Sequence, residues 1–166
     1  MLGCYDFNGH YDWTFEWFRK LGGETLVKRY WVEAIALDSQ RHAAALIMAE
    51  GFVGMKKYWE PTLEEEGGEH SMHMGSDHYR SDMLDCPSLG FLMRNNIRFY
   101  HDYCEHCAGW VHPIMEAAGF ITYSEHDHCG HCRWEFRRKG DPTPALTDTP
   151  NLPGWNADTV HRFEKS

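Results

Sequence analysis

The spacing of apolar residues predicts a long helix in the first third of the chain. No glycine or proline occurs between Glu24 and Glu50. Apolar residues recur there at the spacing of one helix face: Val27, Trp31, Ala34, Ile35, Ala45, Leu46 and Ala49. The stretch therefore predicts one amphipathic helix, which Gly51 and Gly54 then loosen.

A second helical pattern spans the middle of the chain. Its apolar positions alternate between steps of four and three residues: Met93, Ile97, Tyr100, Cys104, Cys107, Val111, Ile114 and Ala118. Both cysteines fall on the predicted buried face. Pro113 cannot donate a backbone hydrogen bond, so we expect a kink or a restart there, and Gly119 ends the segment.

Two shorter stretches flank the first helix. The aromatic residues Trp13, Phe15, Trp17 and Phe18 indicate a short helix packed on the long one, or a pocket wall, and packing is the favoured interpretation. Pro61 and the acidic run at 64–69 close this half of the chain, and the run is expected to be a solvated loop.

Alternating apolar and polar residues predict strands after each helical half. Residues 70–82 alternate weakly. Residues 120–124 and 132–138 form a predicted hairpin whose turn contains the sequence HDHCGH. On the second strand Cys132, Trp134 and Phe136 share one face, because neighbouring strand residues point to opposite faces.

These patterns predict an α+β fold, with two long helices packed on a small antiparallel sheet. The length of 166 residues, with 42% hydrophobic residues, supports a single core that needs no metal to fold. Four prolines between positions 141 and 155 indicate an extended segment. We therefore expect one domain over residues 1–140 and a proline-rich tail over 141–166.

Charge and hydropathy exclude several classes of partner. The net charge of −9, without a basic stripe, argues against nucleic-acid binding. No run of about 18 apolar residues predicts a membrane span. The first residues lack the basic and apolar regions of an export signal, so we expect a cytoplasmic protein with reduced cysteines.

Two similar cassettes carry the clearest chemistry, HDYCEHC at 101–107 and HDHCGHC at 126–132. Each contains a C-x-x-C pair, and 21 residues separate the pairs, slightly more than in typical structural zinc sites. Zinc or iron bound by Cys104, Cys107, Cys129 and Cys132 is the predicted arrangement. The alternative is a set of ordinary buried cysteines beside loop histidines.

One polar pair interrupts the apolar face of the first helix. Asp38 and His42 lie four residues apart, so a carboxylate could orient a histidine base there. The alternative is a narrower apolar face, with both side chains in water.

A resemblance to a known family adds a second arrangement of the cysteines. Cys86-Pro87, Cys107 with Trp110, and residues 132–136 (CRWEF) resemble the L-2-amino-thiazoline-4-carboxylic acid hydrolase-like family, over about residues 24–138. A more distant likeness is to 4-vinyl reductase domains.

The resemblance implies that Cys86, Cys107 and Cys132 converge on one pocket, where His101 or His128 completes an open, reactive metal site. In the four-cysteine arrangement, by contrast, Cys86 stands apart as a nucleophile or a core residue.

The resemblance implies a metal-dependent hydrolase that opens a small C–N or C–S heterocycle. The competing hypothesis is a metal-stabilised module that binds or senses a small ligand without transforming it. A redox module is less favoured, because Cys104 is expected well inside a helix rather than at its start. The aromatic N-terminal stretch would also suit a homodimer surface.

Overall fold

The computed structural model describes residues 3–141 and 152–165, with side chains described for residues 9–141 and 152–160. The architecture is α+β with an antiparallel sheet, as predicted. Most of the proline-rich segment, at 142–151, lies outside the described residues.

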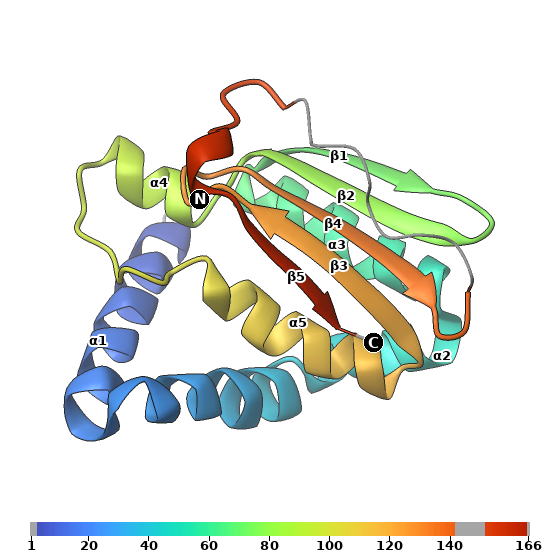
Figure 1. Cartoon of the computed structure of the whole chain (residues 1–166), viewed down its shortest axis with the longest axis horizontal. Coiled ribbons are helices and arrows are strands. Elements are labelled where there is room, and N and C mark those ends of the chain that lie inside the picture. The colour runs from blue at the N-terminus through green and yellow to red at the C-terminus, as the bar shows by residue number, and fades with distance from the viewer. Residues whose placement is uncertain (1–2, 142–151, 166) are drawn as a thin grey trace.

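The first predicted helix is part of a longer helical path. It comprises α1 (Gly3–Tyr30), the π-helix η1 (Trp31–Ser39) and α2 (Arg41–Glu50). Gly22 and Gly23 leave helical geometry inside α1, and the helix changes direction there (Figure 1). Gly51, at a φ of 63°, then turns the chain into α3 (Phe52–Glu66).

The acidic run at 64–69 is not a loop throughout, which corrects the prediction. α3 continues through Pro61 to Glu66, and the three glutamates of the run form its last turn. Gly67 ends the helix at a left-handed φ of 72°, a conformation that glycine adopts without steric cost. Its N–H donates to the backbone oxygen of Glu64 at 3.2 Å.

The second helical pattern also differs from the prediction, because it forms two separate helices. These are α4 (Leu89–Arg94) and α5 (Glu105–Ala117), and α5 runs through Pro113. Asn96, at a φ of 52°, interrupts the path after α4. Cys104 therefore occupies the N-cap of α5 rather than a helix interior.

The sheet has the strand order β1-β2-β4-β3-β5 in the described residues, with every neighbouring pair antiparallel. Its strands are β1 (Glu69–Met74), β2 (His78–Asp85), β3 (Phe120–His126), β4 (Cys132–Arg138) and β5 (His161–Lys165). The predicted hairpin is confirmed as β3 and β4.

The end of the segment 141–166 belongs to the sheet, whereas most of the proline-rich part of the predicted tail lies outside the described residues. Residues 161–165 form β5 and pair with β3. The physical reason is that β3 would otherwise end the sheet with unpaired backbone groups, which β5 satisfies.

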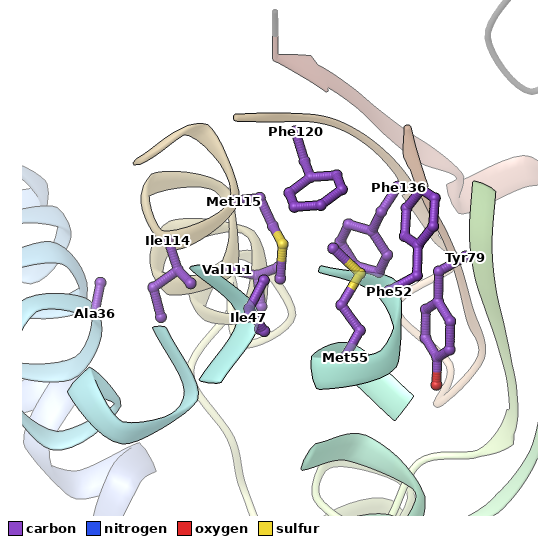
Figure 2. Close-up of a cluster of buried hydrophobic side chains, with 10 residues drawn as sticks. All are labelled: Ala36, Ile47, Phe52, Met55, Tyr79, Val111, Ile114, Met115, Phe120 and Phe136. Carbon is purple, nitrogen blue, oxygen red and sulfur yellow. The ribbon is translucent and has the colours of Figure 1, made fainter. Parts of the chain in front are cut away.

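The core lies between the helices and one face of the sheet. Figure 2 shows aromatic and aliphatic side chains meeting there, with Met115 of α5 near Phe120 and Met55 of α3 near Phe52. Each fully buried large side chain contributes about 1.5–3 kcal/mol. A second cluster joins α1 to α4 around Phe15, which is fully buried, whereas Trp13 is 76% exposed.

No helix within the described ranges has both the length and the apolar character that crossing a membrane would require.

Candidate functional site

A cavity of about 370 Å³ lies between α3, α5 and the covered face of the sheet. Aromatic and sulfur-containing side chains make up much of its wall. The lining residues are Tyr11, Gln40, His42, Tyr58, Trp59, Thr62, Leu63, Glu66, Ser81, Met83, Cys86, Pro87, Ser88, His106, Cys107, Trp110, Val111, Cys132, Trp134 and Phe136.

Strand periodicity explains why β2 and β4 both reach this cavity. Met83 lies opposite Cys132 in the ladder, and Ser81 lies opposite Trp134. Paired residues point to the same face of an antiparallel sheet. The predicted face of β4 therefore lines the cavity with Cys132, Trp134 and Phe136.

Stacked rings form a flat wall. The ring centroids of Trp59 and Phe136 lie 5.2 Å apart with an interplanar angle of 11°. The rings of Trp134 and Phe136 lie 6.0 Å apart at 17°. Parallel aromatic faces favour a planar, unsaturated ligand over a bulky aliphatic one.

Three thiols, those of Cys86, Cys107 and Cys132, line the same cavity. The turn between β3 and β4 helps to position Cys86, whose N–H donates to Gly130 O at 2.8 Å. Gly130 has a φ of 97°, and a Cβ there would lie 3.4 Å from the Cα of Gly90. This close approach joins the turn to the start of α4.

The electrostatics show that four thiols belong to one cluster. Burial is the largest cause of the raised pKa of Cys86, Cys104, Cys107 and Cys132, and repulsion from neighbouring thiolates raises the pKa of Cys104, Cys107 and Cys132 further. Backbone N–H groups of residues 88–90 partly offset this rise at Cys86. Thiolates are donors that zinc and iron accept. Among the described residues, however, no three of these thiols have sulfur atoms within 4.8 Å of one another, so binding one ion would require the side chains to move closer.

A second group of donors adjoins this cluster. One ligand atom each from Cys104, His126 and His128 lies within 4.8 Å of the others. His126 is opposite Cys132 in the β3–β4 ladder, so its side chain points to the same face as the thiol. His128 has a left-handed φ of 55° in the following turn.

Asp127 holds that turn in shape. Its Oδ1 accepts hydrogen bonds from the N–H groups of Cys129 at 2.8 Å and His131 at 3.1 Å. Its Oδ2 accepts one from the N–H of Asn156 at 3.1 Å. The fully buried carboxylate therefore joins the turn to the segment that precedes β5.

The predicted four-cysteine set is only partly brought together. Cys104, Cys107 and Cys132 belong to the thiol cluster, but its fourth member is Cys86. Cys129 interacts elsewhere, since Asn156 Nδ2 donates to its Sγ at 3.7 Å. The three cysteines of the family resemblance, Cys86, Cys107 and Cys132, all line the cavity, and whether they share a metal stays a prediction.

The predicted histidines and Asp38 lie at different places relative to the cavity. His101 is exposed, with Nε2 3.3 Å from Asp102 Oδ2 and 3.8 Å from Glu24 Oε1, and does not line the cavity. His128 joins Cys104 rather than the three-thiol pocket. His42 lies at the cavity although it is largely exposed, whereas Asp38 is exposed and outside the lining.

The pair Cys104 and Cys107 lies at a helix start, not well inside a helix as predicted: Cys104 caps α5 and Cys107 lies in its first turn. A reactive redox thiol nevertheless needs a lowered pKa. Burial instead raises the pKa of both thiols, so the placement alone does not favour redox chemistry.

Two cavity residues were not predicted from the sequence. His106 is buried, its Nδ1–H donates to Tyr103 O, and burial lowers its pKa to about 4. Its neutral Nε2 lies 3.6 Å from Cys107 Sγ. Burial also raises the pKa of Glu66. The cassette at 101–107 gave a sequence signal for His106. Glu66 had none, because it lies among other glutamates in a run that was predicted to be a solvated loop.

No family model, curated protein or solved structure matches this chain.

Proposed function

We propose that this protein is a metal-dependent enzyme that opens a small, unsaturated C–N or C–S heterocycle by hydrolysis. The observation that carries the proposal is that Cys86, Cys107 and Cys132 all line one aromatic-walled cavity. The resemblance of these three cysteines to the hydrolase-like family supports the same reaction class.

The three thiols would hold the metal, either zinc or iron, because thiolates are soft ligands that suit both. Three protein ligands leave a coordination position available to a ligand in the cavity. The bound ion would supply Lewis-acid chemistry, polarising the bond to be broken and activating water. The free thiols of the described cysteines are compatible with the reducing cytoplasm that we propose.

The chain's own side chains would bind the ring and move the proton. Trp59 and Trp134, which are only partly buried and stack against the buried ring of Phe136, would contact a planar ring in the cavity. Glu66 lines the same cavity, and its raised pKa keeps a proton available to a leaving nitrogen or sulfur. The apolar wall excludes competing water from the ring.

A second candidate is a small-ligand binding or sensing module, which the aromatic wall also supports. In this case the cavity holds a planar ligand and no bond is broken. An enzyme is distinguished from a binding module by the release of a reaction product. Hydrolytic opening of a 2-aminothiazoline ring adds water across the C–S bond, so that the carbon keeps the oxygen and the sulfur leaves as a thiol.

The first test compares Cys132→Ser with the control Cys129→Ser, in protein purified without oxygen. We expect Cys132→Ser to lose metal and thiol release from a 2-aminothiazoline carboxylate, because it removes a ligand of the cavity. Cys129→Ser keeps both, since its thiol lies outside the cluster. Elemental analysis and a thiol reagent measure the two quantities. Full metal content in Cys132→Ser would contradict the proposal.

If metal is lost with Cys132→Ser while the wild-type protein binds the ring compound but releases no thiol, the binding module replaces the enzyme.

A further inference from the structure

We propose that Cys104, His126 and His128 bind a second metal ion of the zinc class, adjacent to the three-thiol pocket but separate from it. This inference goes beyond the proposed function, because it does not depend on what the cavity binds or transforms.

Three different elements bring these donors together. Cys104 is at the N-cap of α5, His126 is at the end of β3, and His128 is in the turn that Asp127 holds. Their ligand atoms all lie within 4.8 Å of one another. In a tetrahedral zinc site such atoms lie about 3.3–3.6 Å apart, so side-chain adjustments of about 1 Å complete the geometry.

The two imidazoles are suitably arranged for one shared ion. Their ring centroids lie 4.3 Å apart and their planes are nearly perpendicular, at 85°. Perpendicular rings present nitrogens to a common point without stacking face to face. His126 is 4% exposed, which limits competition from bulk water for the ion.

A carboxylate that could supply a fourth ligand lies beside His126, although it is outside the group of three. Glu105 follows Cys104 in the chain, and its Oε1 lies 3.5 Å from His126 Nε2. A carboxylate, two imidazoles and a thiolate form a donor set that zinc accepts. The carboxylate and the thiolate together neutralise a divalent ion.

Geometry separates this site from the cavity. Cys86, Cys107 and Cys132 line the cavity, whereas Cys104 does not. Recruitment of Cys104 by the histidines would leave the cavity with three thiol donors.

The test is a cobalt(II) titration of the metal-free, full-length protein in the presence of a weak competing chelator. Cobalt reports its ligands, because thiolate ligands produce an intense near-ultraviolet band that grows with their number. We expect two equivalents of cobalt per chain in the wild-type protein.

His128→Asn is the informative variant, because asparagine tolerates the left-handed backbone of this turn. It should bind one equivalent and keep most of the thiolate band. Cys104→Ser should likewise lose one equivalent. His73→Ala, which changes an exposed histidine of β1 that belongs to neither group of donors, serves as the control and should keep both equivalents.

A wild-type protein that binds a single equivalent, with the same amount retained in His128→Asn, overturns the second site. If Cys132→Ser keeps both equivalents while His128→Asn loses one, the second site stands and the three-thiol metal of the proposed function fails.

Discussion

At the residue scale, Glu66 connects the cavity to acid–base chemistry. Burial is the largest cause of its raised pKa, and the charge of the neighbouring Glu65 adds to it. A carboxyl with a raised pKa remains protonated at a higher pH than an ordinary glutamate. Glu66 can therefore act as a general acid above the pH at which an exposed glutamate has lost its proton.

Glu66→Gln should lower kcat by about 100-fold, because the amide keeps the shape of the side chain but cannot give up a proton. Metal content should be unchanged. The sign of the pH dependence follows from the raised pKa, so wild-type activity falls as the pH rises through that pKa. Steady-state rates against pH measure both effects, and an unchanged profile in Glu66→Gln would exclude this acid.

At the scale of elements, the turn between β3 and β4 has the largest influence on the site. It carries His128, it accepts a hydrogen bond from the N–H of Cys86, and Asp127 holds its backbone. Both candidate metal sites therefore depend on one short turn. Its backbone at position 130 has a φ of 97°, a conformation that favours glycine.

Gly130→Ala should destabilise the protein by about 1–2 kcal/mol, because alanine is strained at a φ of 97°. Metal affinity should fall as well, since the displaced turn moves Cys86 and His128. Urea unfolding and metal titration measure the two effects. Gly9→Ala is the control, as a Cβ in α1 would have no neighbour within 4 Å. It should be neutral or stabilising.

At the scale of the whole molecule, the proposed metal binding would be coupled to folding. The donors come from α5, β3, β4, the intervening turn and the segment before α4, so an unfolded chain cannot present them together. Metal at 100 times its dissociation constant should stabilise the fold by about 2.7 kcal/mol. Thermal unfolding with and without a chelator tests this, and an unchanged Tm would contradict it.

The helical and strand periods allowed much of the fold to be predicted from the sequence. The hairpin of β3 and β4 and the cavity-facing side of β4 followed from alternation. The break at Asn96 was not predictable, because periodic apolar residues continue across it. The pairing of β5 with β3 depends on a partner strand remote in sequence, which no local pattern identifies.

The sequence by itself determined the donor types, the helix and strand faces, and the antiparallel α+β class. Only the tertiary structure decided which donors meet: Cys86 joins the thiol cluster, Cys129 lies outside it, and His126 and His128 turn toward Cys104. The physical reason is that spacing along the chain sets local direction only. The distance between remote side chains depends on strand register, on the docking of the turn against α4, and on where α5 begins.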